Sequence, residues 1–178
     1  MWRSAFDDFL LQRLKARYLN PIQSLQDHGL YQGEGFSIVA IQVTLVEFLA
    51  ATIAGISYRF LKPGERLKVY EYDKSGKLFA EFLATEEPFR SEFSTVLAGE
   101  FYRNVRCALL HEARTKQGWS IWAQSDQGRI VDGNRKIVFR NDFQRRLEEF
   151  LDLYRDRIGA DLRIQEAFIR KMDSLCFE

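Results

Sequence analysis

Apolar residues recur at helical spacing along most of this chain, which predicts a mainly α-helical protein. The stretch 2–19 is expected to be an amphipathic helix, because apolar side chains four residues apart share one helix face. These residues are Phe6, Leu10, Leu14 and Tyr18. Pro21 lacks the amide hydrogen that continues a helix, so we expect Asn20-Pro21 to end it and at most a short helix to follow over 22–30.

Residues 37–60 are strongly apolar and predict a long central helix. β-branched residues are frequent here, but the run is too long for one strand and holds no internal turn residues. Gln42 and Glu47 interrupt it, so it never offers the roughly 18 uninterrupted apolar residues that a membrane span needs. We therefore expect a buried core helix and no membrane partner.

The rest of the chain predicts a loop, two helices and a small sheet. Residues 61–74 are expected to be a loop, and Ser75 is expected to cap a short helix over 77–83. A longer helix is predicted over 91–116, with Gly118 as its stop.

Beyond Gly118 the pattern changes to short β-prone runs separated by turn residues. These runs are 119–123, 129–131 and 136–139. They predict a small antiparallel hairpin or three-stranded sheet, followed by a helical region over 142–177 that bends at Gly159. The expected architecture is one domain over 1–178: a helical bundle with a β insertion before its C-terminal helices.

Composition indicates a cellular compartment and argues against some classes of protein. With 178 residues and 46% hydrophobic content, the chain supports one well-buried core. Cys107 and Cys176 are too few for a disulfide framework, and acidic residues stand where a secretory leader would be apolar, so a cytoplasmic location is expected. The net charge of +1 gives no global argument for nucleic-acid binding.

Positive charge is nevertheless concentrated in the predicted helix over 91–116. Between residues 103 and 116 four cations face the single acid Glu112, and they are Arg103, Arg106, Arg114 and Lys116. They form either a local RNA-binding surface or ordinary solvated helix charges. Asn104, Cys107 and His111 fall along one line of this helix, with Arg103 within a quarter turn of His111 and Arg106 beside the line.

The segment Arg106-Cys-Ala-Leu-Leu-His111 resembles the motif of HEPN domains, an arginine and a histidine separated by four to six residues. The wider stretch 101–119 is similar to a plasmid- and phage-defence branch of that family. The resemblance implies a helical bundle and a metal-independent endoribonuclease without a cofactor, of the kind found in toxin–antitoxin and defence systems. It also implies a homodimer with a composite site, and an antitoxin or regulatory protein as a further partner.

The residue types suit metal-free RNA cleavage. Imidazole, with an ordinary pKa of about 6.5, serves as acid or base near neutral pH, which makes His111 the candidate for proton transfer. Guanidinium groups stabilise the developing phosphorane charge, so Arg106 and Arg103 are candidate phosphate contacts and Asn104 an orienting residue. The expected products carry a 2′,3′-cyclic phosphate and a 5′-hydroxyl.

Other interpretations of the same residues stay open. Cys107 stands where related nucleases often have a polar residue, so either Asn104 takes that role or the chain is a silent module for RNA binding, dimerisation or partner binding. A helical adaptor unrelated to RNA is a third possibility. A zinc site is not expected, because Thr115 occupies the second ligand position of a His-Glu-x-x-His motif and His28 is the only other histidine.

Overall fold

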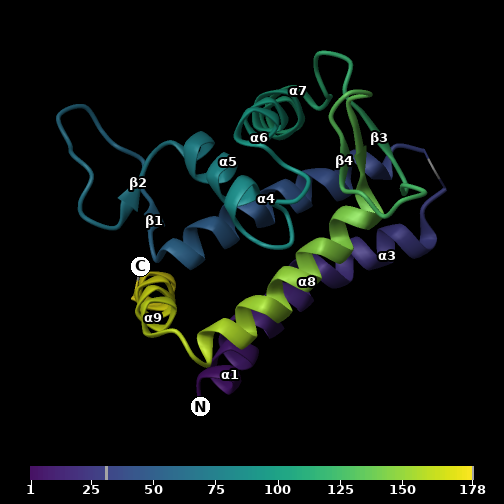
Figure 1. Ribbon diagram of the computed structural model, residues 1–178. Coiled ribbons are helices and arrows are strands. Elements are labelled where there is room, and N and C mark those ends of the chain that lie inside the picture. The colour runs from purple at the N-terminus through teal and green to yellow at the C-terminus, as the bar shows by residue number, and fades with distance from the viewer. Residues whose placement is uncertain (31, 178) are drawn as a thin grey trace.

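Helices account for 64% of the chain and strands for 7% in the computed structural model, which describes residues 1–30 and 32–177 (Figure 1). The mainly α-helical prediction is confirmed. Two small sheets lie beside the helices, one between the central helix and the next helix and one before the C-terminal pair.

The N-terminal residues form one continuous helix. Its segments are α1 (Trp2–Ala5), π-helical η1 (Phe6–Leu11), α2 (Gln12–Leu14), π-helical η2 (Lys15–Leu19) and α3 (Asn20–His28). Our prediction that Asn20-Pro21 ends the helix is wrong, since Asn20 keeps helical angles of φ −63° and ψ −43°. The π-helical turn of η2 shifts the hydrogen-bond register just before Pro21, so the missing amide hydrogen falls where the ladder is already broken.

Helix α4 (Glu34–Ala54) runs through the centre of the molecule and contacts α3, α5, α8 and α9. The predicted continuation to residue 60 is wrong, because Gly55 takes a left-handed conformation with φ +65° and ends the helix. A Cβ at Gly55 would lie 2.6 Å from Cα of Ala167, so only glycine fits where α9 crosses. Lys171 donates to the carbonyl of Ile56 at 3.1 Å, which ties the chain just after α4 to α9.

By length and composition alone, α4 is the one helix among residues 1–30 and 32–177 that could cross a membrane. Buried core helices meet the same criteria, and Figure 1 shows α4 lying between α5 and α8. Its packing against these neighbours explains its apolar character without a membrane.

Strands β1 (Ser57–Tyr58) and β2 (Glu71–Tyr72) pair in parallel after α4, and the sequence pattern predicted neither. Helix α5 (Ser75–Thr85) follows. The prediction that Ser75 caps this helix is wrong; Lys74 occupies the cap position, and the Ser75 hydroxyl is 2.9 Å from the Tyr102 hydroxyl. Ser75 therefore links the start of α5 to the helix that carries Tyr102.

The predicted helix over 91–116 is present but shorter at both ends. It is continuous through α6 (Thr95–Phe101), π-helical η3 (Tyr102–Cys107) and α7 (Ala108–Glu112). The Ser94 hydroxyl caps its start by accepting from the amide of Leu97 at 3.2 Å. Ala113 takes a left-handed conformation with φ +53° and ends the helix before Gly118.

Strands β3 (Ser120–Trp122), β4 (Val131–Asp132) and β5 (Ile137–Phe139) form a sheet in the order β3-β5-β4. The antiparallel pairing of β4 with β5 is confirmed, but β3 pairs with β5 in parallel, so the sheet is mixed. The tight turn at 133–136 links only β4 and β5, whereas the long connection after β3 carries the chain to the far edge of β5.

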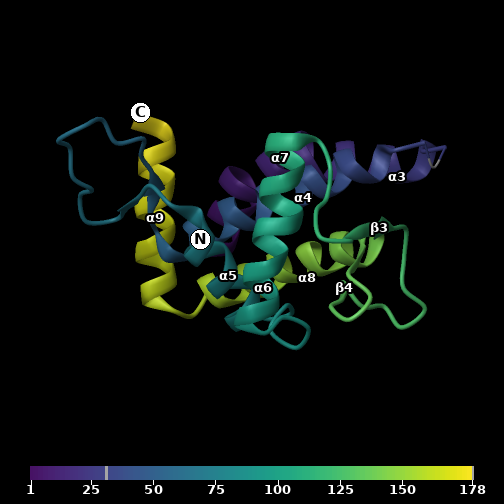
Figure 2. The same ribbon diagram turned by 90° about the horizontal axis from the view of Figure 1, so that it is seen from above.

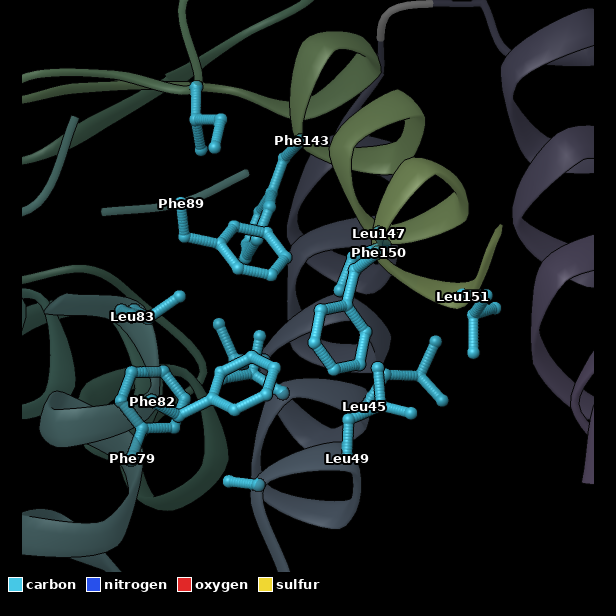
Figure 3. Close-up of a cluster of buried hydrophobic side chains, with 14 of the residues drawn as sticks. Leu45, Leu49, Phe79, Phe82, Leu83, Phe89, Phe143, Leu147, Phe150 and Leu151 are labelled. Atoms are coloured by element: carbon cyan, nitrogen blue, oxygen red, sulfur yellow. The ribbon is translucent and has the colours of Figure 1, made fainter. Parts of the chain in front are cut away.

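Helices α8 (Arg140–Ile158) and α9 (Leu162–Phe177) complete the fold, and the chain turns at Gly159 as predicted. Aromatic side chains of α8 pack against α5 and the turn after it (Figure 3). The Phe150 ring lies 4.9 Å from Phe82 and 5.9 Å from Phe89 between ring centroids. This cluster fixes α5 on the core and thereby the start of α5, where Ser75 lies.

Tyr154 is completely buried, and its hydroxyl has no hydrogen-bond partner among the described residues. Burial also raises the pKa of this phenol, so it stays protonated. We expect Tyr154→Phe to leave the free energy of unfolding unchanged or raise it by about 1 kcal/mol, because the ring is kept and an unsatisfied group is removed. Urea denaturation measures this, with Tyr102→Phe as the matched change that removes a hydrogen-bonded hydroxyl and should destabilise. A clear loss of stability in Tyr154→Phe alone would contradict the prediction.

Candidate functional site

The helix that carries the predicted motif forms a ridge on one face of the molecule. Seen from above, α6 and α7 lie in front of α4 (Figure 2). Its inner side is buried in the core through Ala98, Phe101, Val105, Ala108 and Leu109. Its outer side is exposed at Arg103 and His111, whereas Asn104 and Cys107 of the predicted polar stripe are half-buried.

Arg106 does not point along the outer side. Its Nη2 atom is 2.5 Å from Oε2 of Glu47 on α4, and its guanidinium lies 5.4 Å from the ring centroid of Tyr102. The two charged side chains are only 17% and 16% exposed. Burial opposes the charge on Arg106, but Glu47 together with Tyr102 and Cys107 holds the pKa of the guanidinium above its ordinary value.

Glu47 joins Arg106 to the sheet that follows α4. The Tyr72 hydroxyl donates to Oε1 of Glu47 at 3.5 Å, a long contact, and burial together with the Glu47 charge raises the pKa of that phenol. The sequence pattern marks Glu47 only as an interruption of an apolar helix and gives no sign of the contact with Tyr72. The available signal was that Glu47 is a charged residue in the middle of a buried helix, where a partner is required.

His111 lies in the last turn of α7 and is exposed. None of the described residues forms a hydrogen bond or ion pair with its side chain. It is not among the residues that line the pocket where Arg106 is held. Arg106 and His111 therefore do not line this pocket together within one protomer.

The other predicted catalytic residues, Arg103 and Asn104, lie on the same helix as His111, and Arg103 is exposed. Cys107 is half-buried. Asn104 is half-buried, and its backbone carbonyl accepts from the amide of Lys116 at 2.9 Å, which ties the following loop back to the helix.

Most of the predicted RNA-binding cations already have an acidic partner. Arg114 lies 3.2 Å from Glu112, and Lys116 is also paired with that carboxylate. Hydrogen bonds from Lys116 and then Arg114 lower the pKa of Glu112. Among the described residues, Arg103 is the one predicted RNA contact without an acidic partner.

The donor chemistry offers no ready metal centre. Within residues 1–30 and 32–177, no group of three or more histidine, cysteine, aspartate or glutamate side chains is close enough to hold a metal ion. Comparison with known proteins found no matching family model, no similar curated protein and no similar solved structure. Function is accordingly inferred from the motif and its geometry.

The Arg106–Glu47 pair should contribute measurably to stability. We expect Glu47→Gln to lower the free energy of unfolding by about 1–3 kcal/mol, because it leaves a largely buried guanidinium without its counter-charge. A double-mutant cycle with Arg106→Gln, followed by urea denaturation, measures the coupling. The control cycle uses Lys77 and Glu81, an ion pair that is 85% and 54% exposed and should couple by less than about 0.5 kcal/mol. Equal coupling in the two cycles would show that the buried pair has no special role.

Proposed function

We propose that this protein is a metal-independent endoribonuclease of HEPN type that acts as a homodimer in the cytoplasm, as a toxin or defence effector. The observation that carries the proposal is the state of His111, which is exposed, without a partner among the described residues, and five positions after Arg106 on an uncovered helix. An exposed imidazole that is not engaged by another side chain is available for proton transfer to or from bound RNA.

The outer side of the ridge supports dimerisation through this helix. Val96 and Leu110 are large apolar residues that are exposed there, and Arg103 lies between them. Gly99 and Cys107 are small and let a second helix approach closely. An isologous contact between two copies of this face would place two Arg103 and two His111 side chains near one axis.

The chemistry then divides among named residues. His111 removes the proton of the 2′-hydroxyl or protonates the departing 5′-oxygen, and Arg103 stabilises the negative charge on the phosphorane. Arg106 has one Nη atom on Glu47 and retains donors for a phosphate oxygen that enters from its pocket. Asn104 orients the phosphate or the imidazole.

The alternative is a silent HEPN-like module that binds RNA or a partner protein without turnover. Three observations favour it: Glu47 neutralises Arg106, Glu112 pairs with both Arg114 and Lys116 and so reduces their combined charge, and Cys107 stands where the related nucleases often have a polar side chain. In this case the ridge serves dimerisation or partner binding alone.

Cleavage of labelled single-stranded RNA and tRNA in EDTA distinguishes the two functions. The nuclease should release fragments that end in a 2′,3′-cyclic phosphate and begin with a 5′-hydroxyl. Products with a 3′-hydroxyl and a 5′-phosphate would exclude this mechanism, and intact RNA at every enzyme concentration would favour the silent module.

Gly99 provides a test of the dimer that leaves the protomer intact. Only Arg103 Nη1, at 3.5 Å, lies within 4 Å of a Cβ built at Gly99, so a side chain fits in the protomer. We expect Gly99→Gln to raise helix stability by up to about 1 kcal/mol and to weaken dimerisation at least about 10-fold, because the side chain blocks close helix approach. Sedimentation equilibrium measures the dissociation constant, and Phe9→Gln on the N-terminal helix is the control. Parent protein that stays monomeric at all concentrations would contradict the proposed dimer.

A further inference from the structure

The connection between β1 and β2, residues 59–70, projects from the helices as an open loop that we call the arm (Figures 1 and 2). Large apolar side chains are exposed on it, including Phe60, Val69 and Tyr70. Residues 57–77 contain six cations and three acids, a net charge of +3 in a chain whose total is +1. Aromatic and basic side chains therefore occur together on a surface that the core does not cover.

A pocket of about 810 Å³ opens at the base of the arm. Its lining combines aromatic, basic and acidic side chains from β1, α4, the start of α5 and η3. They include Tyr58, Lys74, Lys77, Tyr102, Arg106 and Glu47. This volume falls within the range of about 300–1,000 Å³ that is usual for small-ligand sites and is sufficient for one nucleotide.

The wall of the pocket is held by a chain of contacts. The Tyr58 ring meets Tyr72 edge-on, with 5.7 Å between centroids and an interplanar angle of 73°. Tyr72 contacts Glu47, and Glu47 in turn holds Arg106. Tyr58 is still 56% exposed, so an aromatic face fixed at the mouth of the pocket remains accessible.

The balance of charge favours an anion. Glu47 is already neutralised by Arg106, which leaves Asp73 as the acid in the lining that lacks an ion-pair partner among the described residues. Lys74 is exposed and has no acidic partner in the same described set, and Lys77 contacts Glu81 only at 3.5 Å on the open surface. The exposed cations Lys62, Arg66 and Lys68 extend the positive surface along the arm.

A fixed aromatic face combined with flanking cations is the arrangement that binds single-stranded nucleic acid, in which bases stack and phosphates are neutralised. We propose that this pocket binds one nucleotide of a single-stranded RNA, with its base on Tyr58 and its phosphates on Lys74 and Lys77, and that the arm guides the adjoining strand. The inference rests on the proposed ribonuclease function and adds the site that positions the substrate beside Arg106. Double-stranded RNA cannot present a splayed base to Tyr58, so single strands are selected.

Binding rather than cleavage tests the inference. The full-length protein is titrated into a short labelled 2′-O-methyl RNA, which lacks the attacking hydroxyl, and fluorescence anisotropy is recorded at several salt concentrations. Tyr58→Ala should weaken binding on the order of 10-fold. Lys74→Gln with Lys77→Gln should weaken it and reduce the slope of log K against log salt by about 1.4, or about 0.7 for each phosphate that is no longer neutralised.

Matched variants on the N-terminal helix serve as controls. Phe9→Ala removes an aromatic side chain that is 64% exposed, and Lys15→Gln removes an exposed cation; both should leave affinity and salt slope unchanged. Equal affinities for all variants would overturn the inference, as would a preference for duplex RNA or binding of anionic vesicles in place of RNA. Cleavage with no effect of Tyr58→Ala would reject this site but keep the nuclease, whereas pocket-dependent binding without cleavage would reject the nuclease but keep the site.

Discussion

Replacing His111 with alanine should reduce the rate of RNA cleavage by a factor of about 10² to 10⁴, the usual contribution of a general acid or base. Single-turnover cleavage of labelled RNA in EDTA measures this rate directly. The side chain is exposed and has no hydrogen-bond partner among the described residues, so the free energy of unfolding should change by less than about 0.5 kcal/mol. Loss of activity without loss of stability would assign the imidazole to the chemistry.

His28 provides the matched control for this substitution. It is the other histidine of the chain, it is exposed at the end of α3, and its Nδ1 atom is 3.0 Å from the carbonyl oxygen of Ser24. His28→Ala should cleave RNA at the parental rate. If His111→Ala and His28→Ala both cleave RNA at the parental rate, His111 has no catalytic role. The proposed assignment of the chemistry to this imidazole is then wrong.

The parts of the fold that could be predicted from the sequence were those set by local pattern. Periodic apolar residues located α4, the helix that carries the motif, and the C-terminal pair with its turn at Gly159. The errors occurred where a distant contact decides the outcome. Helix α4 ends at Gly55, where Ala167 lies too close for any side chain, and β3 pairs in parallel with β5 across a long connection; neither contact can be deduced from periodicity.

The same distinction separates the predicted from the missed parts of the site. The exposed stripe with Arg103 and His111 follows from helical spacing within a single element. The ion pair between Glu47 and Arg106 joins residues 59 positions apart, and the pocket above it also needs Tyr58 and Lys74 from other elements. The spacing of Arg106 and His111 in the sequence therefore does not reveal that Glu47 supplies a counter-charge to Arg106.

The largest expected loss of stability is at Phe150, on the core side of α8. Its ring is completely buried against Phe82 and Phe89, so Phe150→Ala removes a large apolar group and leaves a cavity between α8 and α5. We expect the free energy of unfolding to fall by about 3–5 kcal/mol. That is a large part of the roughly 5–15 kcal/mol typical of a whole domain. Urea denaturation measures the change, and Phe9→Ala, at an exposed aromatic position, should cost less than about 0.5 kcal/mol.

A substitution at Phe150 should also affect the proposed RNA pocket, because its neighbour Phe82 belongs to α5. The start of α5 contributes Ser75 and Lys77 to the pocket lining. Phe150→Leu keeps most of the apolar volume and should retain a folded protein in which that effect can be measured. Weaker RNA binding by this variant, at a temperature where it is fully folded, would show that the α8–α5 contact positions the pocket. A loss of stability below about 1 kcal/mol in Phe150→Ala would instead mean that the surrounding aromatic rings close the cavity, and that α5 is held chiefly by its contacts with α4 and α6.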